Sequence, residues 1–202
     1  MQKLIKILIY LFLAFNFLYS QDKNSVFNSL VKEFKDIKSI YIEYKSLDIP
    51  NLSGTILAKK GNYYKITTND RLIVCDSKTI WNYSLIDKNV IISNAKNLSS
   101  ASLENVFFQL IDNYEPTDLN KVTNSKGSTY YELYLKSKDN SNTTFDKIIL
   151  ILNSKNRIEE IKLYEKFRNT NIKIEQINLN VKTDDNTFKF EVNEKMEVID
   201  LR

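Results

Sequence analysis

The spacing of apolar residues along the chain predicts two amphipathic helices. Between residues 22 and 38 apolar side chains recur every three or four positions, with lysine and aspartate on the other face, and Asp22 or Ser25 can cap the start. The same spacing returns between residues 99 and 114, with serines near the start and Pro116 just after the end. The apolar positions of this second helix are Leu103, Val106, Phe107, Leu110 and Ile111.

Alternation of apolar and polar residues predicts ten or eleven β-strands and a short final stretch. The predicted strands cover residues 40–45, 53–60, 63–68, 71–75, 78–83, 88–93, 129–136, 145–152, 158–167, 171–182 and 187–192, and the final stretch covers 196–201. Most links between them are short and polar, such as Gly61-Asn62, which favours antiparallel hairpins over βαβ crossovers.

A meander of this many strands has to curl into a barrel or half-barrel, or split into two sheets. Two amphipathic helices need an apolar surface to cover, and the concave face of a curled sheet supplies one. We therefore expect a mainly β (α+β) fold in a single domain, with an apolar space between the sheet and the helices.

The first 20 residues have the pattern of a secretory signal peptide. Lys3 and Lys6 precede an apolar run from Ile7 to Phe17, and Ser20 stands before an expected cut at Gln21. A retained membrane anchor is the alternative, but the run is short for a bilayer span. No cysteine follows the run, so we expect residues 21–202 to form a secreted domain without a lipid anchor. Loss of two lysines would leave a net charge of 27 − 25 = +2.

The composition argues against several classes of function. The 202 residues include no histidine, which removes histidine-based triads and nearly all common zinc sites, and three glycines are too few for a nucleotide-binding loop. The excess of 29 Lys and Arg over 25 Asp and Glu is too mild for a dedicated nucleic-acid binder. Cys75 lies in an apolar stretch without an activating partner. We expect a monomer that is not an enzyme and has no metal, cofactor or nucleic-acid partner.

Aromatic residues concentrate on neighbouring predicted strands. Tyr63, Tyr64, Trp81 and Tyr83 can be explained by ordinary core and cross-strand packing, or they can form the wall of a lipid-binding cavity. Phe107 on the second predicted helix has the same two interpretations, because an apolar helix stripe is usually part of a core. The pattern alone leaves both open.

Four stretches together resemble the LolA family of periplasmic outer-membrane lipoprotein carriers. The most specific is the run Leu72–Tyr83, LIVCDSKTIWNY, which is similar to the family's L-x-V-S-D-G-K-T-L-W-x-Y. The others are Gly54–Lys60, Asn62–Ile66 and the ending Phe188–Val192, FKFEV, which is similar to the start of F-x-F-x-x-P. The order and spacing of these stretches agree with the family over essentially the whole mature chain.

The resemblance implies an unclosed antiparallel β-barrel covered by a helical lid. Its cavity would take the acyl chains of lipoproteins that an inner-membrane lipoprotein-releasing ABC transporter supplies and would deliver them to an outer-membrane acceptor. The residues expected at the cavity and lid are Ile56, Ala58, Lys60, Tyr64, Ile66, Trp81, Tyr83, Phe107 and Leu110. A carrier of another lipid or glycolipid, or a periplasmic regulator that senses lipoproteins, would have the same fold. A hydrolase ranks lower, because no convergent acid–base pair can be named.

The sequence departs from the family pattern at several positions. Lys60 replaces an arginine that in the family sits on the sheet and hydrogen-bonds backbone oxygens of the lid, and Gly61 replaces the proline that follows it. Lysine keeps the charge but lacks the planar fork of arginine. Ser77 stands at a turn glycine and is expected to tolerate a positive φ less well, and Asn193 replaces the closing proline.

Overall fold

A computed structural model describes residues 22–49, 53–95, 113–125, 127–138, 143, 145–167 and 169–202. Its α-helix, α2, spans Lys23–Lys35 and confirms the first predicted helix. The Asp22 carboxylate accepts a hydrogen bond from the Ser25 backbone N–H and so satisfies one of the free donors at the helix start. Val26, Phe27, Leu30 and Phe34 form the buried face of the helix.

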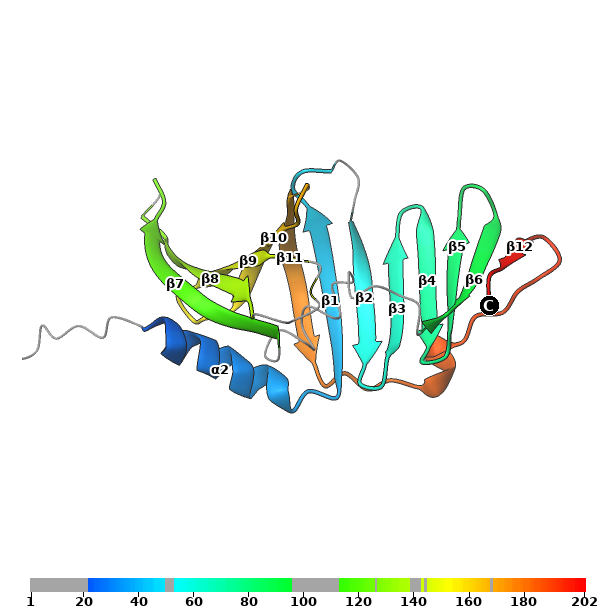
Figure 1. Ribbon diagram of the computed structural model, residues 1–202, viewed down its shortest axis with the longest axis horizontal. Coiled ribbons are helices and arrows are strands. Elements are labelled where there is room, and N and C mark those ends of the chain that lie inside the picture. The colour runs from blue at the N-terminus through cyan, green and yellow to red at the C-terminus, as the bar shows by residue number, and fades with distance from the viewer. Residues whose placement is uncertain are drawn as a thin grey trace, which may run out of the picture.

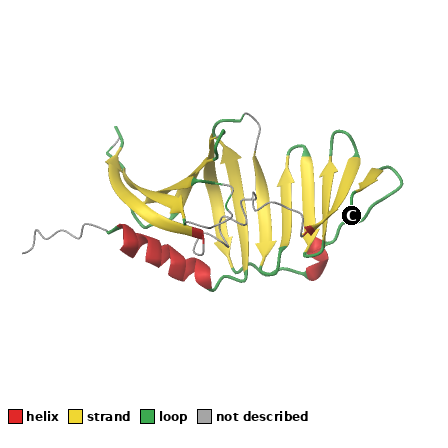
Figure 2. Cartoon of the chain, in the orientation of Figure 1, coloured by secondary structure: helices red, strands yellow, loops and turns green. Residues whose placement is uncertain are grey.

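The described residues form one sheet of twelve strands, which curls at the end beside α2 (Figures 1 and 2). The strands are β1 (Ser39–Ser46), β2 (Ser53–Lys59), β3 (Tyr63–Thr68), β4 (Arg71–Asp76), β5 (Thr79–Ser84), β6 (Asn89–Asn94), β7 (Tyr114–Thr123), β8 (Thr129–Ser137), β9 (Lys147–Asn153), β10 (Ile158–Tyr164), β11 (Asn169–Leu179) and β12 (Glu197–Asp200). Their order is β12-β6-β5-β4-β3-β2-β1-β11-β10-β9-β8-β7. The sheet does not close, because β12 and β7 lie at its two edges.

All neighbouring strands are antiparallel except β12, which runs parallel to β6. The predictions of a mainly β fold and an unclosed sheet are therefore confirmed, with one parallel pair that was not expected. The predicted strands other than 187–192 are confirmed, and the final stretch 196–201 contains β12.

The strand predicted at residues 187–192 is wrong. A short 3-10 helix, η2 (Asp185–Phe188), begins there because the Asp184 side chain accepts a hydrogen bond from the Asn186 backbone N–H at 2.9 Å. No strand is assigned between η2 and β12. The alternation of Phe188 and Phe190 instead reflects two aromatic rings that pack on the sheet.

Strand β7 was not predicted. Its burial pattern lacks the alternation of a half-buried strand, and its pairing with β8 is shifted at a bulge between Pro116 and Asp118. A proline is tolerated there because β7 is an edge strand. Tyr114, which ends the predicted helix 99–114, begins β7, and its hydroxyl donates to the Phe145 carbonyl at 3.0 Å. Burial raises the pKa of the Tyr114 hydroxyl. Residues 99–112 of that helix lie outside the described residues.

The main core lies on the face of the sheet toward α2, which we call the inner face. It joins the buried side of α2 to isoleucine and leucine side chains from seven strands. Fully buried members of these strands are Ile40, Ile42, Ile56, Leu133, Leu135, Ile148, Leu150, Leu152 and Ile161. A second, smaller set of apolar residues lies on the opposite, outer face.

This outer cluster is formed by Val74, Val90 and Ile92 from the sheet and by Phe188 from η2, all of them buried. The chain after η2 continues over the same strands. The Phe190 ring stacks on Trp81 with the ring centroids 6.3 Å apart and also contacts Tyr83. The C-terminal segment, residues 180–202, therefore covers the outer face of the sheet near β3 to β6 (Figure 1).

Candidate functional site

The inner face of β1 to β5 carries a continuous apolar strip. Strand pairing places Ile56 opposite Ile66 and Ile66 opposite Ile73, and it places Ala58, Tyr64, Cys75 and Ile80 in the row beside them. Side chains opposite one another in adjacent strands share a face, so the two rows form one surface. The row from Ala58 to Ile80 is buried, whereas Ile66 and Ile73 are only partly buried.

Helix α2 faces the inner surface of the neighbouring strands. A pocket of about 440 Å³ lies between the helix, β11 and the β9–β10 turn. Its apolar lining is formed by Leu30, Phe34, Ile158, Ile174, Ile177 and Leu179. Polar side chains, including Glu33, Arg157 and Glu175, line the rest. The helix therefore borders a pocket whose lining is part apolar and part polar.

Two lysines hold the ends of α2 against the sheet. At the end of the helix, the Lys60 ammonium donates to the Lys35 carbonyl at 3.0 Å. At its start, the Lys23 ammonium donates to the Thr117 carbonyl of β7 at 2.7 Å. The last carbonyls of a helix lack partners within the helix, so the Lys60 ammonium satisfies a group that would otherwise need water.

The residues expected at the cavity do not all lie on the same face of the sheet. Ile56, Ala58, Tyr64 and Ile66 share the inner face, and Lys60 reaches the end of α2 from the β2–β3 turn. Trp81 and Tyr83 lie on the outer face, where they pack with Phe190 instead of joining the other residues. Phe107 and Leu110 lie outside the described residues.

The sequence reasoning missed Ile73, Cys75 and Ile80, which extend the inner surface into β4 and β5. The signal that could have found them is the tight turn between β3 and β4. A tight turn fixes the strand register, and register fixes which residues share a face. Working outward from Tyr64 in this way leads to Cys75 and then to Ile80.

The outer face of β8 to β10 carries charged side chains beside the buried Ile149 and Ile151 of β9. The Lys162 ammonium lies 3.6 Å from the Glu132 carboxylate, which also accepts a hydrogen bond from the Tyr134 hydroxyl at 2.8 Å. That hydrogen bond raises the pKa of Tyr134. Burial raises the pKa of the nearby Glu160 carboxyl, although Lys162 opposes the shift. This side of the sheet therefore combines charged and apolar side chains, whereas the inner face is apolar.

Comparison with protein-family models identifies the family to which this chain belongs. The family model described as "Outer membrane lipoprotein carrier protein LolA" matches residues 42–191. The chain belongs to the LolA family. The resemblance seen in the sequence is therefore confirmed, and the family description is that of a carrier protein rather than an enzyme.

Solved structures that match this chain include an uncharacterized conserved protein from Thermus thermophilus. It is 11% identical with a TM-score of 0.53, over 89% of this chain and 99% of that one. LprF from Mycobacterium bovis is 10% identical with a TM-score of 0.45, over 82% and 96% of the two chains. The lipoprotein LppX from Mycobacterium tuberculosis is 10% identical with a TM-score of 0.45, over 80% and 97%. No curated protein matches the chain.

Within the described part of this LolA-family chain, no helix has both the length and the apolar character that a membrane crossing requires. The same residues contain no group of three acidic or cysteine side chains placed to hold a metal ion. The family description and the apolar inner face are those of a binding protein.

Proposed function

We propose that this LolA-family protein carries lipoproteins across the periplasm by holding their acyl chains against the inner face. The signal peptide, residues 1–20, would be removed, and residues 21–202 would act as a monomer. An inner-membrane lipoprotein-releasing ABC transporter would load the protein, and an outer-membrane acceptor would unload it.

The observation that carries this proposal is the apolar strip on the inner face. Ile66 and Ile73 are only partly buried there, beside the fully buried Ile56 and Cys75. Each methylene of an acyl chain removed from water contributes roughly 0.8 kcal/mol. A short stretch of chain laid along such a strip therefore suffices for binding, and partial exposure of the strip keeps the binding reversible.

Helix α2 would form part of the lid over this site. The contact between the Lys60 ammonium and the Lys35 carbonyl supports this role, because it joins the sheet to the helix end through one hydrogen bond. A lysine makes a single point contact where an arginine could form two parallel bonds, so this lid would open more readily than one held by arginine. Phe107 and Leu110, from the second predicted helix, would complete the lid.

The test is a pair of substitutions on neighbouring residues of β3. Ile66→Glu places a charge on the inner face, whereas Thr67→Glu places the same charge on the exposed outer side. Binding of a fluorescent acylated peptide should weaken by at least about tenfold for Ile66→Glu, because the carboxylate would have to lose water. Thr67→Glu should bind as the wild type does.

Mass spectrometry of molecules that co-purify from the host periplasm identifies the cargo. An acylated N-terminal cysteine peptide is expected. A glycolipid or free lipid would refute lipoprotein transport and would favour a LolA-fold carrier of another lipid. Equal acyl-peptide binding by folded Ile66→Glu and Thr67→Glu proteins would refute the inner face as the site.

A further inference from the structure

Large apolar side chains are exposed on several connections at one end of the strands, in addition to Val192, Val198, Ile199 and Leu201 of the C-terminal segment. Antiparallel pairing places the β1–β2, β5–β6 and β10–β11 connections at the same end, the upper edge in Figure 1. The large apolar residues exposed on these connections are Leu47 (51%), Leu85 (45%), Ile86 (74%) and Phe167 (92%). We call this set the apolar rim.

The connections at the opposite end of the strands are polar. They comprise residues 60–62 between β2 and β3, 77–78 between β4 and β5, and 154–157 between β9 and β10, and none of these residues is a large apolar one. Scattered apolar residues on a surface need no explanation, but their segregation to one end of a sheet is informative. The two ends of the strands thus present different surfaces.

Hydrogen bonds hold the rim residues in place around β1 and β11. The Asp48 carboxylate accepts from the Asn171 backbone N–H at 2.5 Å and from its side-chain amide at 3.0 Å. The Leu47 backbone N–H donates to the Asn171 carbonyl at 2.8 Å. These three bonds join the connection that carries Leu47 to the start of β11, which directly follows the connection that carries Phe167.

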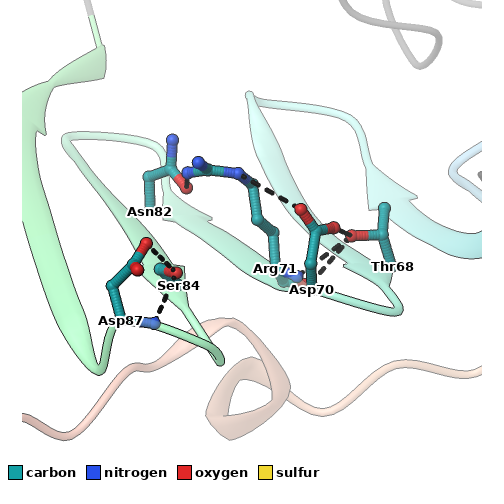
Figure 3. A network of polar contacts seen from close by, with 6 residues as sticks. All are labelled: Thr68, Asp70, Arg71, Asn82, Ser84 and Asp87. Carbon is teal, nitrogen blue, oxygen red and sulfur yellow. Dashed lines mark hydrogen bonds and ion pairs between the residues drawn. The ribbon is translucent and has the colours of Figure 1, made fainter.

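The turn that carries Leu85 and Ile86 is held in a similar way (Figure 3). The Ser84 hydroxyl donates to the Asp87 carboxylate at 2.8 Å and accepts from the Asp87 backbone N–H at 3.1 Å. The Leu85 backbone N–H donates to the Asp70 carbonyl of the neighbouring β3–β4 turn at 2.8 Å. Hydrogen bonds therefore fix the backbone of the turns that carry the exposed apolar side chains.

Charged side chains of both signs occur at this end of the strands, including Glu165 on the connection of Phe167 and the exposed Asp146 beside the end of β10. Lys45, Lys88 and Lys166 are exposed beside the apolar residues, and no ion pair involves them among the described residues. The Lys166 ammonium lies over the Phe167 ring, 5.6 Å from its centroid. The carboxylates of Asp48, Asp70 and Asp87 on these connections accept hydrogen bonds from neighbouring residues.

We propose that the apolar rim docks on the surface of a lipid bilayer, with Phe167 and Ile86 entering the boundary between headgroups and acyl chains. The apolar residues stand on separate convex connections, which suits a fluid surface better than the continuous packed core of a protein interface. Exposed lysines beside them can reach anionic headgroup phosphates.

Docking in this way would determine which end of the apolar strip faces the membrane. The partly buried Ile66 and Ile73 lie toward the rim end of β3 and β4, whereas the buried Tyr64 and Cys75 lie toward the other end. The contact of Lys60 with α2 is also at that other end. This inference rests on the proposed function for its purpose, because the more open part of the apolar strip would face the membrane in which the acceptor takes over the acyl chains.

The experiment is flotation of the processed protein, as purified from the periplasm, with vesicles of phosphatidylethanolamine and phosphatidylglycerol. The wild type should float with the vesicles. The double variant Ile86→Ser with Phe167→Ser should bind at least about tenfold more weakly, because each side chain loses apolar area buried in the interface. Leu201→Ser removes a side chain that is 62% exposed but lies away from the rim, and it should bind as the wild type does.

Absence of wild-type flotation, or equal flotation of the wild type and the double variant, would overturn the proposal. An equal loss of vesicle binding by the Leu201→Ser protein would also overturn it, because binding would then depend on exposed apolar side chains anywhere on the surface. Acyl-peptide binding measured without vesicles separates this proposal from the proposed function. The double variant should keep acyl-peptide binding, and Ile66→Glu should keep vesicle binding while it loses the peptide.

Discussion

Replacement of Phe188 by alanine tests whether the C-terminal segment is held on the sheet by apolar packing. The Phe188 side chain is fully buried on the outer face, and its ring centroid lies 5.8 Å from that of Tyr63. The Lys59 ammonium, 2.5 Å from an Asp185 carboxylate oxygen, provides a polar contact of the same segment. That ion pair lowers the pKa of Asp185, but it is exposed to solvent and screened by salt.

The magnitude follows from the complete burial of the ring. Truncation of a buried phenylalanine to alanine removes its transfer free energy and leaves a cavity, and together these lower the free energy of unfolding by about 3–5 kcal/mol. With a urea dependence of about 2 kcal/mol per molar, the unfolding midpoint should fall by about 1.5–2.5 M. Phe167→Ala makes the same change at a side chain that is 92% exposed, so it should shift the free energy by less than about 0.5 kcal/mol.

The assay uses the single tryptophan of the chain. Trp81 packs against Phe190 in the C-terminal segment, so its fluorescence reports on that segment, whereas far-ultraviolet circular dichroism reports on the whole sheet. Urea unfolding followed by both signals gives the loss of stability and shows whether the segment detaches first. If Phe188→Ala shifts the midpoint no more than Phe167→Ala does, the reasoning that the outer cluster is a packed core is refuted.

Three further substitutions give separate checks. Ser77 has a φ of 76°, so Ser77→Gly should raise the free energy of unfolding by about 0.5–1 kcal/mol in urea titrations, and a loss would show that the turn needs the serine. Burial raises the pKa of Glu160, so the folded state binds a proton more readily than the unfolded state. Glu160→Gln should therefore increase stability at pH 7, with a gain that fades as the pH falls through the folded pKa toward the unfolded value near 4.5, and a gain independent of pH would contradict this reasoning. Lys60→Met removes the ammonium that donates to the Lys35 carbonyl and should speed hydrogen exchange at the end of α2, whereas Lys60→Arg should not.

The strands from β1 to β6 could be predicted from the sequence because local signals specify them. Each has apolar residues bounded by polar connections, and tight turns such as Gly61-Asn62 join several of them. Strand β7 could not be found in this way. It is an edge strand with a bulge after Pro116, so its apolar positions do not alternate.

Phe188 and Phe190 misled the prediction for the opposite reason. The two residues are spaced as in a strand. Their rings pack on the outer face of the sheet, but the backbone that carries them does not pair with a strand. Trp81 and Tyr83 were expected beside Tyr64, yet they point to the other side of the sheet. A side-chain pattern gives the period of a strand but does not say which of its faces is the inner one.

The sequence by itself determined the local features of this protein: the helix at residues 22–38, most of the strands, and membership in the LolA family. These depend on neighbouring residues and short motifs. The tertiary structure alone decided that β1 lies between β2 and β11, that β12 pairs with β6, and that Lys60 reaches α2. Such contacts join residues far apart in the chain, and they form only when the whole sheet buries its apolar faces together.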